Sequence, residues 1–163
     1  MMGAGKTTVG RELARRTGWP FLDNDDLVRD LTGREPAAID AEDGEDALHD
    51  AEAAALRAAI ARAGPAIIAV AGGFITADGE PDLLAAAGHV VWLRVAAHIL
   101  QARIGAGEGR RADALDPGWL TARATAREAR YRAVADQVID GDDLGPAAVA
   151  EAILAAFDGR SAG

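Results

Sequence analysis

Residues 1–13 read MMGAGKTTVGREL, and this stretch decides the fold. Gly5, Lys6 and Thr7 form the second half of the phosphate-binding pattern G-x-x-x-x-G-K-[ST], whose first glycine would fall one position before Met1. In such a loop the backbone N–H groups surround phosphate, the lysine reaches the β- and γ-phosphates, and the hydroxyl holds Mg²⁺. The stretch therefore predicts a nucleotide-binding loop with a bound Mg²⁺.

Two further observations favour this interpretation over a chance G-K-T sequence. Val9, Leu13 and Arg16 recur at helical spacing after the loop, so a helix would begin where its dipole and unpaired N–H groups can hold phosphate. Lys6 is also the single lysine among 17 basic residues. A compact ammonium differs from a planar guanidinium, which indicates that this chain uses its lysine for a specific purpose.

Composition limits the class of protein. A chain of 163 residues, half of them apolar, fits one globular domain with a sizeable core. The net charge of −9 argues against nucleic-acid or anionic-membrane partners. The chain has no cysteine, which excludes disulfides, and its uncharged run 63–77 is too short to span a bilayer. We therefore expect a cytoplasmic protein.

Apolar patterns and turn residues alternate along the chain. Short apolar runs predict strands within 19–26, 65–73, 89–95 and 135–140. Helical patterns cover 7–16, 45–63, 97–103, 119–135 and 145–157, the last with Pro146 in its first turn. A glycine-rich loop at 104–118 and a frayed tail at 158–163 complete the pattern. The alternation predicts a three-layer α/β/α fold with a parallel sheet.

The strand that normally precedes such a phosphate loop is missing from the sequence. That strand lies in the middle of the sheet with both faces buried. Losing about five inward side chains would remove roughly 7 to 15 kcal/mol. This rivals the whole stability of a typical domain, about 5 to 15 kcal/mol. We therefore expect the natural chain to carry about ten more residues before Met1, a strand and the leading glycine.

The chain resembles shikimate kinase, a small member of the nucleoside monophosphate kinase-like P-loop family. The resemblance rests on MGAGKTTVGRELA, FLDNDDLV, DGEDALHDAE, AGGFIT, VVWLRV and REARYRAVA, which follow in this order from residue 2 to residue 135. It implies transfer of the γ-phosphoryl group of ATP to the 3-hydroxyl of shikimate, with Mg²⁺ as cofactor. It also implies a substrate-binding region at 24–62 and a mobile lid at 104–118.

The resemblance assigns roles to individual residues. The implied catalytic residues are Lys6, Asp25 and Arg110. The nucleotide would be bound by Gly3, Ala4, Gly5, Lys6, Thr7, Thr8, Arg103, Arg110 and Pro146. The acceptor would be bound by Asp25, His49, Gly72, Gly73 and Arg127, and the metal by Thr7 and Asp23. Arg111 takes a place that the family usually gives to proline, so either Arg110 or Arg111 could be the lid arginine.

Two assignments also follow from the residues themselves. Asp23 and Asp25 stand two positions apart at an expected strand end, where their side chains would point to the same side. The alternative is that Asp25 or Asp26 caps the next helix. The remaining arginines of 119–135, namely Arg123, Arg130 and Arg132, are expected on a solvated helix face.

Three positions depart from the family pattern, all in the acceptor half. His49 stands where a second carboxylate-binding arginine is usual, Ala71 replaces the first of three glycines, and Asp40 replaces an aromatic residue. Three functions remain open: a shikimate kinase with a weakened substrate grip, a kinase of another small polyol or cyclitol, and a degenerate nucleotide-binding regulator without turnover. A monomer acting on a small molecule is expected for the first two.

Overall fold

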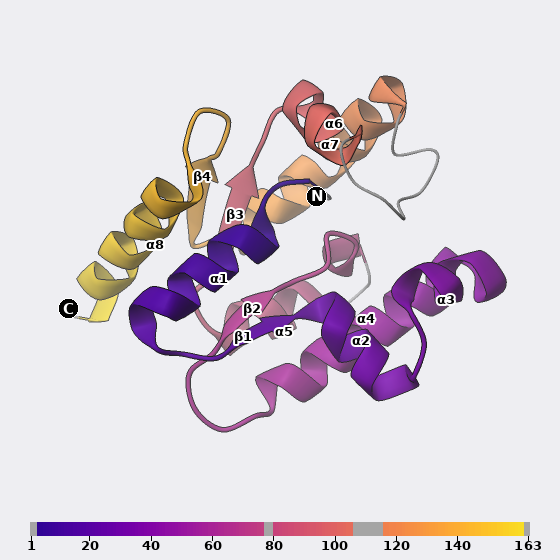
Figure 1. Ribbon diagram of the computed structural model, residues 1–163, viewed down its shortest axis with the longest axis horizontal. Helices are drawn as coiled ribbons and strands as arrows, with labels where there is room; N and C mark the ends of the chain where they lie inside the picture. The colour runs from indigo at the N-terminus through magenta and orange to yellow at the C-terminus, as the bar shows by residue number, and fades with distance from the viewer. Residues whose placement is uncertain (1–2, 77–79, 106–115, 162–163) are drawn as a thin grey trace.

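The computed structural model describes residues 3–76, 80–105 and 116–161 (Figure 1). Its helices and strands alternate along most of the chain. In order they are α1 (Lys6–Thr17), β1 (Phe21–Asp23), α2 (Asn24–Thr32), α3 (Pro36–Asp43), α4 (Glu45–Ile60), β2 (Ile67–Ala69), η1 (Phe74–Thr76), α5 (Glu80–Ala87), β3 (Val91–Arg94), α6 (Ala97–Gly105), α7 (Pro117–Val134), β4 (Gln137–Asp140) and α8 (Pro146–Ser161).

The described strands form two separate parallel pairs (Figure 1). β1 pairs with β2, with Leu22 opposite Ile68, and β3 pairs with β4, with Trp92 opposite Val138. The predicted parallel arrangement is confirmed, but the sheet is divided between β2 and β3. Within 3–76, 80–105 and 116–161, no strand lies between these two pairs.

Helices cover both faces of the strands, as a three-layer α/β/α fold requires. On one face α1 and α8 pack together, and Ile67 of β2 and Leu93 of β3 contact their apolar side chains. On the other face the next residue of β2, Ile68, packs against side chains of α4, η1 and α5. Successive residues of a strand point to opposite faces, so β2 contributes to both cores.

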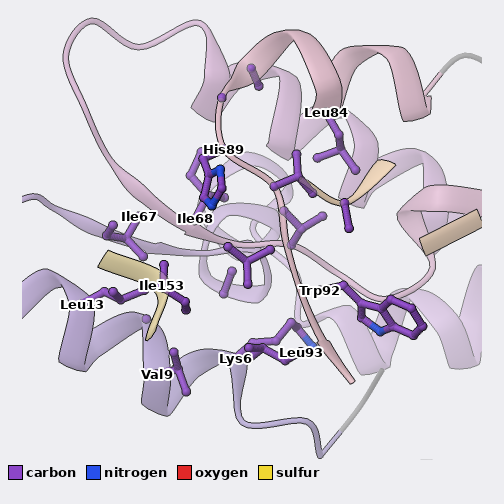
Figure 2. A pocket seen from close by; sticks show the side chains of 18 of the residues that line it. Lys6, Val9, Leu13, Ile67, Ile68, Leu84, His89, Trp92, Leu93 and Ile153 are labelled. Atoms are coloured by element: carbon purple, nitrogen blue, oxygen red, sulfur yellow. The ribbon is translucent and has the colours of Figure 1, made fainter. Parts of the chain in front are cut away.

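A cavity of about 300 Å³ separates the two strand pairs. Figure 2 shows side chains from α1, β2, β3 and α8 along its wall, with Lys6 beside Leu93. The apolar lining includes Val9, Leu13, Ile67, Val91, Leu93 and Ile153. The cavity therefore lies where the sequence pattern expects a central strand.

Glycines fix the course of α1. The helix starts after Gly5, with φ of 88°, and ends at Gly18, with φ of 73°, and both values favour glycine. Gly10 lies against β1, because a Cβ atom there would come within 2.3 Å of the Phe21 ring. Close packing of α1 on β1 thus depends on the missing side chain.

The structure contains helices that the sequence pattern did not predict. α2, α3 and α5 are all short. Within α3, which the structure describes in full, Ile39 is the single buried residue. α8 continues to Ser161, so residues 158–161 are helical where a frayed tail was expected. Both ends of the expected lid are also helical, since α6 reaches Gly105 and α7 begins at Pro117, while 106–115 lie outside the described residues.

The lengths and apolar character of the helices bear on membrane insertion. In the described part of the chain, none is both long enough and apolar enough to cross a bilayer. This agrees with the short uncharged run noted in the sequence, which in the structure is broken into β2 and η1.

Candidate active site

The phosphate loop leads into the N-terminus of α1. Gly3 and Gly5 both have left-handed backbone angles, with φ of 76° and 88°. A Cβ atom on Gly3 would come within 3.1 Å of the Leu100 carbonyl oxygen, so the loop needs glycine there. The first turn of α1 carries no acidic residue and Gly5 provides no side-chain cap. The N–H groups of this turn are therefore suited to hold an anion such as phosphate.

Thr7 and Asp23 form a hydroxyl–carboxylate pair beside this loop. The Thr7 hydroxyl donates a hydrogen bond of 2.7 Å to Asp23 Oδ2. Hard oxygen ligands of this kind suit Mg²⁺, which usually takes one or two protein ligands and completes its shell with phosphate oxygens and water. Among the residues that the structure describes, no cluster of three or more acidic or histidine side chains offers an alternative metal site. The pair therefore fits a metal that arrives with the nucleotide.

Asp25 lies close to this pair, but not in the way its spacing predicted. β1 ends at Asp23 and α2 begins at Asn24, so Asp25 is in the first turn of a helix and the strand-based explanation is wrong. The helix cap is also neither Asp25 nor Asp26, since Asp23 Oδ1 accepts the 3.3 Å hydrogen bond from the Asp25 amide.

The surroundings of Asp25 change its acidity. Its side chain keeps contact with solvent, yet desolvation by the surrounding protein still raises its pKa, and the Asp23 carboxylate raises it further. The Lys6 ammonium acts in the opposite direction. Lys6 and Asp25 are therefore near enough to interact, at the junction of the phosphate loop and α2.

Two buried charged side chains of α4 and α7 extend this group, since Glu52 interacts with both Asp25 and Arg127. Glu52 is 9 % exposed and Arg127 is 8 % exposed. Burial, followed by the Asp25 carboxylate, raises the pKa of Glu52 to about 7, and burial also lowers the pKa of Arg127. The sequence analysis missed Glu52. Its spacing of three residues from His49 on a helix was the available signal, because it places both on one face.

The glycine turn after β2, at residues 72–73, lies between side chains of α4 and α7. A Cβ atom on Gly73 would come within 2.4 Å of His49 Nε2, so the imidazole packs directly on this glycine. The Tyr131 hydroxyl donates a 2.6 Å hydrogen bond to the Gly72 carbonyl, and Arg127 stands one turn before Tyr131 on α7. The structure thus brings His49, Gly72, Gly73 and Arg127 together.

The remaining departures from the family pattern lie at the edges of this group. Ala71 is half-buried, and its carbonyl accepts a 3.3 Å hydrogen bond from the Phe74 amide at the start of η1. Asp40 lies half-buried near the end of α3.

Arg123 was expected on a solvated face, and the structure corrects this. Its guanidinium pairs with Glu45 at the start of α4 and lies 4.8 Å from the centre of the Trp119 ring. Arg132, in contrast, pairs with Glu128 at 3.1 Å, and both side chains are more than half exposed. Arg123 therefore belongs to the acceptor side and Arg132 to the outer surface.

A second pocket, of about 290 Å³, adjoins the phosphate loop. Arg103 lies on its wall and donates a 3.3 Å hydrogen bond to the Gly141 carbonyl. The pocket also unites most of the residues expected to bind nucleotide outside the lid, namely Ala4, Gly5, Thr8, Arg103 and Pro146. Arg110 and Arg111 fall outside the described residues. The pocket has the position and lining expected for a nucleotide base.

Known proteins resemble the chain over nearly its whole length. The family model for shikimate kinase matches residues 2–158. A shikimate kinase of Moorella thermoacetica is 39% identical over 157 residues, covering 96% of this chain and 90% of the relative. One of Cupriavidus pinatubonensis is 37% identical over 156 residues, covering 94% and 81%. The solved shikimate kinase of Acinetobacter baumannii, in complex with shikimate, superposes with a TM-score of 0.87 at 28% identity, covering 98% of this chain and 89% of that one.

Proposed function

Because this chain belongs to the shikimate kinase family, we propose that it transfers the γ-phosphoryl group of ATP to the 3-hydroxyl of shikimate. Members of this family use ATP, generally with Mg²⁺. The observation that carries the proposal for this chain is the meeting of Lys6 and the Thr7–Asp23 pair with Asp25, while the buried Glu52 interacts with both Asp25 and Arg127. Phosphoryl transfer depends mainly on such positioning and charge compensation.

The nucleotide half is proposed to act through the phosphate loop and the second pocket. The amides of residues 3–8 bind the phosphates, Lys6 offsets their charge, and Arg103 and Pro146 flank the base. Mg²⁺, when bound, neutralises phosphate charge, and Thr7 and Asp23 would hold it. The role of Arg110 as the lid arginine stays a prediction.

The acceptor half is proposed to hold an acid at one end and a hydroxyl at the other. Arg127, with the glycine turn at 72–73 and His49, binds the substrate carboxylate. Asp25 binds the acceptor hydroxyl and takes its proton as the hydroxyl oxygen attacks the γ-phosphorus and the bond to the β–γ bridging oxygen breaks. The raised pKa of Asp25 supports this role, because a base is most effective when its pKa approaches the working pH.

The proposal is tested by a coupled assay of ADP release with shikimate, ATP and Mg²⁺. We expect turnover by the wild type and a fall of at least about 100-fold in kcat for Asp25→Asn, with the ATP constant little changed. Asp26→Asn, an exposed neighbour on the same helix turn, is the matched control and should keep its activity. ATP binding without turnover on shikimate would refute the proposal, and a polyol screen would then separate a different acceptor from a protein without turnover.

The proposed partners are small molecules. The net charge of −9 supports the prediction that neither nucleic acid nor an anionic membrane surface is a partner. The monomeric state and the cytoplasmic location stay predictions. Size-exclusion chromatography with light scattering would test the first of them.

A further inference from the structure

We infer that Arg123 is a second carboxylate-binding residue of the acceptor site, held by Glu45 until the carboxylate of the substrate replaces that side chain. The inference deepens the proposed function and rests on it. It gives a role in substrate specificity to a residue that neither the motifs nor the resemblance pointed to.

The position of Arg123 on α7 supports this role. Arg123 and Arg127 are four residues apart on one helix, so they project from the same face. Arg127 is buried one turn before Tyr131, which bonds to the glycine turn, and Arg123 reaches the first turn of α4, where it pairs with Glu45. Two guanidinium groups of α7 therefore face the same acceptor region.

One carboxylate oxygen contacts two cation-forming side chains at this place. Glu45 Oε1 pairs with Arg123, and the same oxygen lies 3.6 Å from His49 Nε2. His49 in turn packs on Gly73, next to the turn that Tyr131 joins to α7. The arrangement shows that a carboxylate beside Gly73 can be bound by Arg123 and His49 together. Glu45 occupies the place that an acid of the substrate would take.

The charges of the site favour such an exchange. The nearby Arg123 contributes to lowering the pKa of Arg127, after burial, so the two guanidinium groups repel one another. A carboxylate placed between them would relieve this repulsion. Arg123 and Glu45 are about a quarter and a third exposed, so water can reach the pair and the exchange needs no opening of the core. The Trp119 ring keeps the guanidinium nearby after Glu45 releases it.

The test is Arg123→Leu, which keeps an apolar contact with Trp119 but removes the charge. We expect the KM for shikimate to rise about five- to tenfold, with kcat within about twofold and the KM for ATP unchanged. Shikimate methyl ester, which lacks the negative charge, is the second probe. The wild type should have a lower KM for the acid than for the ester. In the variant, the ratio of these two KM values should be about five- to tenfold smaller.

Two further variants keep the inference falsifiable. Arg132→Leu removes an exposed arginine two turns farther along α7 and should change neither constant. Arg123→Lys keeps the charge without the planar fork and should fall between the wild type and Arg123→Leu, and it serves if the leucine variant does not fold. An unchanged KM in folded Arg123→Leu and Arg123→Lys would overturn the inference while wild-type turnover kept the proposed function. Absence of wild-type turnover on shikimate would overturn both.

Discussion

A segment fused ahead of residue 1 is expected to fill the cavity between β2 and β3 and to stabilise the protein. The designed segment has about ten residues, with five apolar strand residues and a glycine placed one position before Met1. Ordering about ten residues costs about 10 to 20 kcal/mol, and the roughly 7 to 15 kcal/mol gained by burying five side chains offsets most of this cost. The net change in the free energy of unfolding therefore depends on how well the segment fills the cavity.

The expected gain follows from the size of the cavity. At about 24 cal/mol for each cubic ångström of enclosed cavity, filling about 300 Å³ sets an upper bound of about 7 kcal/mol on the gain, because this cavity is partly open to water. The gain should appear in urea denaturation as a higher midpoint and a steeper slope, because more surface becomes exposed on unfolding. Tryptophan fluorescence reports the same transition, since Trp19 and Trp92 both line the cavity.

The control segment has the same length and glycine, but carries serine and asparagine at the strand positions. It should leave the midpoint unchanged, since polar side chains do not gain from an apolar lining. Equal midpoints for the apolar and polar segments would refute the reasoning, because they would mean that this space does not accept a strand. Turnover on shikimate by the chain with and without the apolar segment would show whether the same gap limits activity.

Three further substitutions test other features. Gly10→Ala should lower the free energy of unfolding by about 1 to 3 kcal/mol in urea, although alanine favours helices, because its Cβ meets the Phe21 ring; equal stability would show that the ring yields freely. Folding raises the pKa of Glu52 from 4.5 to about 7, so as the pH rises the unfolded chain loses this proton before the folded chain does. The free energy of unfolding should therefore fall by about 3 kcal/mol between these two pH values. Glu52→Gln should remove that fall, and an unchanged pH profile by urea denaturation would assign it to other groups. His49→Arg should lower the KM for shikimate by about tenfold, whereas an unchanged constant would mean that this side chain does not reach the acid.

Local patterns predicted much of the fold. α1 and α4 have recurring apolar positions over several turns, and the apolar runs at β2 and β3 are bounded by turn residues. α2 and α3 escaped because they are short and rich in charge, with eight or nine residues each, and α3 also has little apolar periodicity. The loop motif predicted a central strand before residue 1, and the structure has a cavity between β2 and β3, but the separation of the strands into two pairs was not predicted.

The site was predictable where one segment defines it. The phosphate loop and Thr7 follow from a short motif, and the structure places Asp23, which the resemblance added, beside Thr7. Glu52 and Arg123 were missed because their environment depends on how α4 and α7 meet, which no local pattern encodes. Asp25 was singled out for a wrong structural reason, since the strand ends two residues before it.

Asp23 serves two purposes with its two oxygens. Oδ2 accepts the Thr7 hydroxyl, while Oδ1 accepts the amide that starts α2. Asp116 also begins a helix, accepting a 2.9 Å hydrogen bond from the Gly118 amide, but this helix is α7 and not one that follows a strand of the phosphate site. Selection for heat tolerance could therefore exchange Asp116 for serine or threonine at little loss, whereas any exchange at Asp23 alters heat tolerance and turnover together.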